Sequence, residues 1–248
     1  MRSFGLTDRG KVRRDNQDSF IIEKCKGKDC LIVALCDGMG GARAGGLASQ
    51  LANKAFVGYV YGKLTSRVNR AIDYQSMLQA ACDEANGVAY EYSQFSEEFN
   101  GMGTTIVGGV IKTGGSGHII NVGDSRAYQV SRRAGTITQI TRDHSLVEEL
   151  VEYGAITPEQ AKNHPQRNVI TRALGSEGTV EADYYPISLS LGDILILCSD
   201  GLSNTITDEE MFACAKAHPD PERLCRTLME LALQRGARDN VTVVAVAR

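Results

Sequence analysis

The sequence predicts an α+β fold, a four-layer α/β/β/α sandwich in which two antiparallel sheets pack face to face between helix pairs. Two observations support this class. Apolar strand patterns come in runs, and helical patterns come in pairs between those runs. A parallel βαβ protein would instead alternate single strands and single helices. Antiparallel sheets packed on each other, with helices on the outer faces, accommodate such runs.

The elements follow from hydrophobic periodicity. The stretches "SFIIEKC" and "LIVALC" predict a hairpin over 19–25 and 31–36, joined by the polar turn "KGKD". Apolar residues at helical spacing predict two helices over 43–62 and 71–95. Later runs predict strands over 104–112, 117–123, 125–131, 136–140, 179–187 and 193–199, two helices within 207–236, and a final strand in "NVTVVAVAR".

Residues 143–175 interrupt the strand pattern and predict a small helical flap. "SLVEELVEYG" is typical of a short helix that ends at Gly154, since glycine is the common residue just past a helix C-terminus. "TPEQAKNH" predicts a second helix with Thr157 as the N-cap and Pro158 in its first turn.

The composition indicates one domain, residues 1–248, with a large core. Hydrophobic residues make up 42% of the chain, and the net charge is −3, so neither nucleic acid nor a membrane surface is indicated as a partner. The 7 cysteines include no C-x-x-C pair, which argues against a zinc site and favours free thiols in a reducing cytosol. No signal segment or membrane-spanning run is present. We therefore expect a soluble, cytoplasmic monomer.

Apolar strands repeatedly carry an aspartate at one end. Asp37 follows "LIVALC", Asp124 follows "GHIINVG", Asp200 follows "DILILCS", and Asp239 directly precedes the last strand. Each acid alone is explained by turn or cap chemistry. Together they predict a cluster, because strands packed in one sandwich bring their ends together.

Converging carboxylates need a counter-charge. Two charges about 4 Å apart repel by about 4 kcal/mol at an effective dielectric of 20. No lysine or arginine lies within two positions of Asp37 or Asp200. An all-oxygen site suits Mg²⁺ or Mn²⁺, so we expect Asp37 to reach two metals, the Gly38 carbonyl to bind one, and the following glycines to leave room for water and substrate. A dinucleotide loop is the alternative, but Arg43 stands where its third glycine belongs.

Motifs along nearly the whole chain carry a family resemblance. They are "DRGKVRRDNQDS" (8–19), "DGMGG" (37–41), "GMGTT" (101–105), "NVGDSRAY" (121–128), "TRDHSLVEELVEYGAIT" (141–157), "HPQRNVITRALG" (164–175), "CSDGL" (198–202) and "RDNVTVV" (238–244). In this order the chain resembles the metal-dependent protein phosphatases, the type 2C serine/threonine phosphatases, in their bacterial single-domain form. The family fold agrees with the predicted sandwich.

The resemblance implies roles for particular residues. Asp37 would bridge two Mn²⁺ or Mg²⁺ ions, with the Gly38 carbonyl on one of them and Asp200 and Asp239 completing the first ion's shell. Asp124 would help to hold a third, weaker ion.

Two further roles lie outside the metal ligands. Asp18 would orient a metal-bound water, and Arg13 would grip the substrate phosphate. Without the resemblance, the basic stretch Arg9–Arg14 is equally well interpreted as a solvated loop.

The chain departs from the family pattern near Asp18 and after "DGMGG". Gln17 stands where a glutamate is frequent, and Ala42 and Gly46 stand where bacterial members usually have histidine and often have glutamate. Met39 occupies the position at which eukaryotic members place a histidine. A proton for the leaving group would then come from a metal-bound water or from a flap histidine, His144 or His164.

The implied activity is hydrolysis of phosphoserine and phosphothreonine on proteins by a water activated at the metals, opposing a bacterial serine/threonine kinase. Ser125 in "GDSR" is a possible nucleophile, but no histidine base is near it in sequence, and a structural role is favoured. A non-catalytic metal-binding regulator and a hydrolase of small phosphate esters are the alternative functions.

Overall fold

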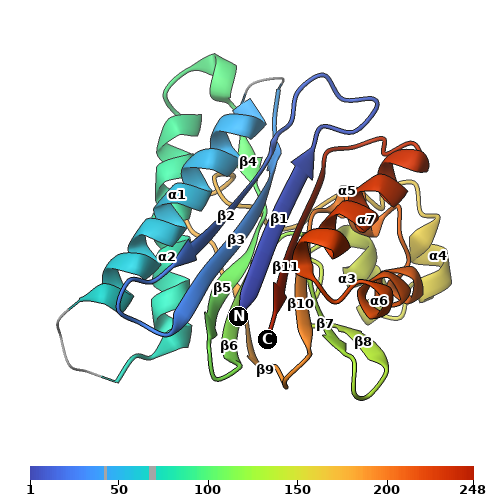
Figure 1. Ribbon diagram of the computed structural model, residues 1–248. Helices are drawn as coiled ribbons and strands as arrows, with labels where there is room; N and C mark the ends of the chain where they lie inside the picture. The colour runs from blue at the N-terminus through green and yellow to red at the C-terminus, as the bar shows by residue number, and fades with distance from the viewer. Residues whose placement is uncertain (42–43, 67–70) are drawn as a thin grey trace.

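A computed structural model describes residues 1–41, 44–66 and 71–248 of the chain. Its layers follow the predicted order, helix pair, sheet, sheet, helix pair (Figure 1). One sheet has the strand order β1-β11-β10-β7-β8, and the other has the order β2-β3-β5-β6-β9, with β4 paired to β3. Every strand pair is antiparallel.

The first sheet consists of β1 Arg2–Asp8, β7 Arg126–Ser131, β8 Thr136–Gln139, β10 Ile194–Cys198 and β11 Val241–Ala247. The second consists of β2 Asp18–Lys24, β3 Cys30–Met39, β4 Gly103–Thr104, β5 Ile106–Lys112, β6 Ser116–Val122 and β9 Asp183–Ser188. The predicted hairpin is confirmed as β2 and β3. Strand β1 was not predicted from the sequence.

Two helix pairs cover the outer faces. Helices α1 Ala44–Thr65 and α2 Tyr74–Ser93 lie on the second sheet, and α6 Asp208–Ala217 and α7 Pro221–Gln234 lie on the first (Figure 1). A one-turn 3-10 helix, η1 Glu97–Phe99, follows α2, and the short α5 Asp200–Ser203 follows β10. Across the described ranges, no helix combines the length and the hydropathy that crossing a bilayer requires.

The predicted flap contains α3 Leu146–Glu152 and α4 Pro158–Lys162. Gly154 has φ +68°, as expected of the residue after a helix end, and Thr157 caps α4 in a capping box with Gln160. The flap lies beside α5 and α6 (Figure 1). Both of its predicted helix boundaries are therefore confirmed.

Alternation along each central strand creates three apolar layers. In β3, Ile32, Ala34 and Cys36 face the α1–α2 pair, whereas Leu31, Val33 and Leu35 face the other sheet. In β10, Ile196 and Cys198 likewise face α6–α7, and Leu195 and Leu197 face the gap between the sheets. Successive side chains of a strand point to opposite faces, so the even–odd register decides which layer a residue enters.

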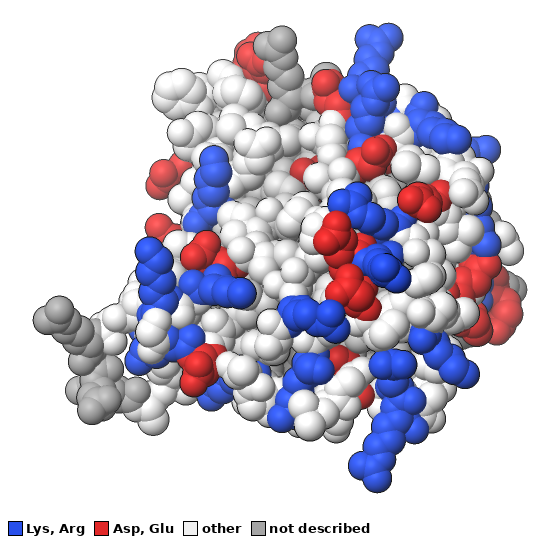
Figure 2. Space-filling view, viewed as in Figure 1, with Lys and Arg blue, Asp and Glu red and all other residues white. Residues whose placement is uncertain are grey.

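Charged side chains of both signs are interspersed over the face shown in Figure 2, in keeping with the net charge of −3. The cysteines are free thiols in the described structure, and most of them are buried. The expectation of free buried thiols is confirmed.

Candidate active site

The predicted acids converge at one end of the two sheets. Asp18, at the start of β2, lies opposite Asp37 near the end of β3. Asp200 begins α5 directly after β10, and Asp239 lies two positions before β11. The carboxylate of Asp37 is repelled by those of Asp18, Asp200, Asp124 and Asp239. The structure therefore brings all five acids into one cluster.

Burial and mutual repulsion make these carboxylates hard to ionise together. Burial is the largest cause in each case, and neighbouring carboxylates add to it. The pKa of Asp37 is raised well above its usual range, that of Asp200 is raised to about 8, and those of Asp18 and Asp124 are each raised to about 6. A cation placed among them would reverse these shifts, because opposite charge favours the ionised form.

Two carboxylate oxygens in the cluster are buried without a hydrogen-bond partner among the described residues, Oδ1 of Asp18 and Oδ1 of Asp200. Buried polar atoms are normally paired. Unpaired anionic oxygens beside other carboxylates fit a divalent cation, so the donor set accommodates Mn²⁺ or Mg²⁺. No group of three or more His, Cys, Asp or Glu in the described ranges is arranged to hold one ion, but Mg²⁺ commonly binds one or two carboxylates and keeps several waters.

The backbone of Asp37 is fixed by two threonines. The Asp37 N–H donates to Thr105 Oγ1 at 3.0 Å, and the Asp37 carbonyl accepts from the Thr105 N–H and from Thr104 Oγ1, each at 2.8 Å. Thr105 Oγ1 also lies 2.7 Å from Ser125 Oγ, and Ser125 is fully buried. Ser125 is therefore structural, as the sequence favoured, and it is unavailable as a nucleophile.

The glycines after Asp37 serve mainly a close backbone contact. A Cβ on Gly38 would lie 2.0 Å from the Gly45 carbonyl oxygen, and one on Gly45 would lie 2.8 Å from the Gly38 carbonyl oxygen. These two glycines thus allow the start of α1 to approach the end of β3. Only Gly41, where a Cβ would meet nothing within 4 Å, fits the predicted role of leaving open space. Ala42 lies outside the described residues.

Arg13 reaches the cluster from the basic loop. Its Nη2 donates to Asp239 Oδ2 at 2.8 Å, and this hydrogen bond is the main reason why its pKa is raised. Asn240 fastens the loop by donating to the carbonyls of Arg9 and Asp15. The loop is consequently held against the acids, and the Arg13 guanidinium lies at the edge of the cluster.

The flap begins beside Asp124. Arg126 and Asp143 form an ion pair, with Arg126 Nη2 2.7 Å from Asp143 Oδ2. His144 is 6% exposed, and its Nδ1 accepts the Gly123 N–H at 3.1 Å while its Nε2 lies 3.4 Å from Asp183 Oδ2. Burial lowers the pKa of His144. Because both ring nitrogens are engaged, His144 does not fit the role of a proton donor to a substrate.

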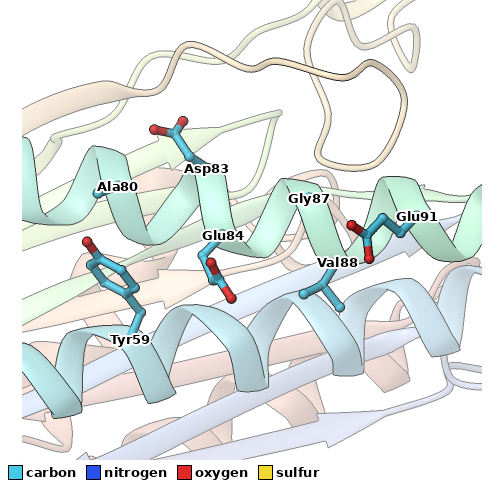
Figure 3. Close-up of a pocket in the computed structure, with 7 residues that line it drawn as sticks. All are labelled: Tyr59, Ala80, Asp83, Glu84, Gly87, Val88 and Glu91. Carbon is cyan, nitrogen blue, oxygen red and sulfur yellow. The ribbon is translucent and has the colours of Figure 1, made fainter.

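A cleft of about 670 Å³ extends from Asp124 and Asp200 between the flap and the α5–α6 segment. Val147 and Lys162 line it from the flap. A separate groove, of about 470 Å³, lies between α1 and α2 and contains none of the clustered acids (Figure 3). Of these two hollows, the first is the one that reaches the acidic cluster, through Asp124 and Asp200.

Sequence reasoning missed two hydroxyl groups of this site. Ser199 and Thr242 both donate to Asp18 Oδ2, at 2.7 and 2.6 Å. Each stands close in sequence to a predicted acid, Asp200 or Asp239. Their position in the strands could have identified them, because both lie at strand ends on the side that faces the other sheet.

Comparison with known proteins identifies the family. The protein-family model described as Protein phosphatase 2C matches residues 9–229 of this chain. The chain belongs to the protein phosphatase 2C family. The serine/threonine phosphatase stp of Listeria monocytogenes is 37% identical over 242 residues, which cover 98% of this chain and 94% of that protein.

Solved phosphatase structures share the fold. That of the serine/threonine phosphatase PstP/Ppp of Mycobacterium tuberculosis has a TM-score of 0.87 at 36% identity, covering 100% of this chain and 98% of that one. A Staphylococcus aureus serine/threonine phosphatase has a TM-score of 0.89 at 36% identity, covering 99% and 94%. The catalytic domain of PstP in complex with 2 manganese ions has a TM-score of 0.83 at 34% identity, covering 98% and 96%. The α+β sandwich predicted from the sequence is confirmed.

Proposed function

We propose that this protein phosphatase 2C member hydrolyses phosphoserine and phosphothreonine on proteins, using a dinuclear Mn²⁺ or Mg²⁺ centre. The observation that carries this function is the cluster of five acids, drawn from both sheets, with unpaired oxygens on Asp18 and Asp200. Relatives of similar length are named serine/threonine phosphatases, and one solved neighbour contains manganese. Phosphoproteins are thus the substrate class.

The chain's own residues divide the work. Asp37, the Gly38 carbonyl, Asp200 and Asp239 would hold the two ions, which supply positive charge and lower the pKa of bound water. Asp37 would serve both ions, and its backbone is fixed by hydrogen bonds with Thr104 and Thr105.

Arg13 would hold two phosphate oxygens through its planar guanidinium, a geometry that lysine lacks. Asp18, with one free oxygen, would accept a hydrogen bond from the attacking water and orient it toward phosphorus. Ser125 is buried and hydrogen-bonded, so a covalent serine intermediate has no support. Direct attack by water is the reaction that this arrangement favours.

Further features complete the proposal. Asp124, with a pKa raised to about 6, would help to hold a third, weaker ion at the mouth of the flap cleft. Residues 1–248 would act as one catalytic domain, with residues 143–175 as a flap that contacts the substrate protein. The protein would work as a cytoplasmic monomer against a cognate serine/threonine kinase, without nucleic-acid or membrane partners.

The test is phosphate release from phosphoserine, phosphothreonine and phosphotyrosine peptides, with and without Mn²⁺. We expect Mn²⁺-dependent release from the first two. Hydrolysis of small aryl phosphates alone would instead identify a small-ester hydrolase. Mn²⁺ binding without any turnover would identify a non-catalytic regulator.

A further inference from the structure

The apolar layer between the two sheets ends in a polar layer at the catalytic edge. Along β11, Val244 and Val246 face this layer, and the next position of the same face is Thr242. Along β10, Leu195 and Leu197 are followed in the same register by Ser199. Thr242 and Ser199 are each 0% exposed. Polar side chains therefore replace aliphatic ones at the last core positions of both strands.

Asp18 meets these hydroxyls from the opposite sheet. In β2, Phe20 and Ile22 pack into the same apolar layer, and Asp18 is the next position of that face. It is 7% exposed. A charge at such a position must be paired to be tolerated, and two hydroxyl groups of the other sheet, those of Ser199 and Thr242, donate to it.

The hydrogen atoms of this cluster have one consistent arrangement. Thr242 Oγ1 donates its only hydrogen to Asp18 Oδ2. Thr7 Oγ1 lies 2.6 Å from Thr242 Oγ1, so Thr7 must be the donor of that bond. Thr7 in turn accepts from Asn16 Nδ2 at 2.9 Å. Every donor in this chain therefore points toward Asp18.

Ser199 closes the arrangement from the other side. Its Oγ accepts the Thr242 N–H at 2.9 Å and donates its own hydrogen to Asp18 Oδ2 at 2.7 Å. Oδ2 thus receives two hydroxyl donors, while Oδ1 has no partner among the described residues. The carboxylate is held by one oxygen, and the other is left free.

We propose that Ser199 and Thr242 are positioning residues, which clamp Asp18 across the two sheets and hold its free oxygen toward the water of the metal centre. The proposal rests on the proposed function of Asp18. Under this proposal the metal site depends on the distance between the two sheets at this edge. Asp18 and Asp37 belong to one sheet, whereas Asp200 and Asp239 flank strands of the other.

The test compares Thr242→Val, which removes the hydroxyl at nearly constant volume, with Thr242→Ser, which keeps it. Mn²⁺ binding is measured by titration calorimetry without substrate. Loss of an outer-shell partner around a metal ion, here a partner of the carboxylate that would orient the metal-bound water, typically costs 10–100-fold in affinity or activity. We expect Thr242→Val and Ser199→Ala to bind Mn²⁺ about tenfold more weakly, and Thr242→Ser to stay within about twofold of wild type.

Thr7→Val is the matched control, because it removes a hydroxyl of the same chain that does not touch Asp18. We expect Thr7→Val to lose much less Mn²⁺ affinity than Thr242→Val. At saturating Mn²⁺, kcat on a phosphoserine peptide should fall in Thr242→Val while KM stays constant, since the proposed role of Asp18 is to orient the water and not to bind the phosphate.

Wild-type Mn²⁺ affinity in Thr242→Val, or an equal loss in Thr242→Ser and Thr242→Val, would overturn the clamp. If Thr242→Val does not fold, Ser199→Ala decides by the same criteria. Should wild-type protein bind Mn²⁺ but release no phosphate from peptides, the proposed function fails, while the affinity comparison still tests the clamp.

Discussion

Replacing Arg13 with alanine should move metal binding and catalysis in opposite directions. Arg13 Nη2 lies 2.8 Å from Oδ2 of Asp239, a residue that is proposed to bind a metal. The guanidinium and a metal ion therefore compete for the same carboxylate. Removing the guanidinium frees Asp239, whereas it also removes the proposed grip on the phosphate.

The expected changes in Mn²⁺ affinity and in kcat/KM follow from the exposure of the ion pair and from the charge of the phosphate. The side chains of Arg13 and Asp239 are 53% and 38% exposed, so their pairing is worth only about 0.2–1 kcal/mol. Since 1.4 kcal/mol is a factor of ten, Mn²⁺ affinity should rise by no more than about fivefold. A hydrogen bond to a charged group contributes about 1.5–3 kcal/mol, so kcat/KM on phosphopeptides should fall by roughly 10- to 150-fold.

The assay pairs Mn²⁺ titration calorimetry in low salt with peptide kinetics at saturating Mn²⁺. Arg14→Ala is the matched control, because Arg14 is exposed and forms no ion pair in the described structure. It should reproduce only the general effect of losing a positive charge. A weaker Mn²⁺ affinity in Arg13→Ala would refute the competition between guanidinium and metal, and an unchanged kcat/KM would refute the proposed grip on the phosphate.

Four other outcomes are expected. Asp239→Asn should keep less than a tenth of wild-type turnover at saturating Mn²⁺ with an intact circular dichroism spectrum; Asp124→Ala should slow peptide turnover but keep two tight Mn²⁺ sites by calorimetry. Burial and the charge of Lys112 lower the pKa of His118 below 6.5, so the contribution of His118 to stability is complete above pH 6.5 and declines below it. The free energy of unfolding in urea should show this decline in the wild type and not in His118→Gln. Gly87→Ala, in a helix position with open space (Figure 3), should stabilise by about 0.5–1 kcal/mol and raise Tm by a few degrees.

Local sequence patterns were sufficient to predict most of the strands and helices. Runs of alternating or continuous apolar residues identified most strands, and cap residues such as Thr157 located the flap helices. Strand β1 was missed because "RSFGLTD" has only two large apolar residues, and it becomes a strand by pairing with β11 at the far end of the chain. Helix α5, with 4 residues, is too short for any periodicity.

Asp37, Asp124, Asp200 and Asp239 were predictable because each stands at a strand end, whereas Asp18 was implied only by the family resemblance. The convergence of all five acids is observed. Their roles as ligands stay predictions. The hydroxyls were not predicted, since serine and threonine beside a turn are ordinary turn residues. Their partner Asp18 is 181 positions from Ser199 and 224 from Thr242. Such contacts depend on the packing of the two sheets and not on local sequence.

Strand register nevertheless contains the missing information. Once the face between the sheets is assigned, Leu195 and Leu197 predict that position 199 is also a core position, and Val244 and Val246 predict the same of position 242. Hydroxyl residues at these two positions, together with the acid Asp18 in the same register of β2, contradict a purely apolar layer. A buried polar group is stable only with its partners in place. Polar residues in core register at one end of several strands therefore indicate where a sandwich of this kind builds its reactive edge, before any ligand is known.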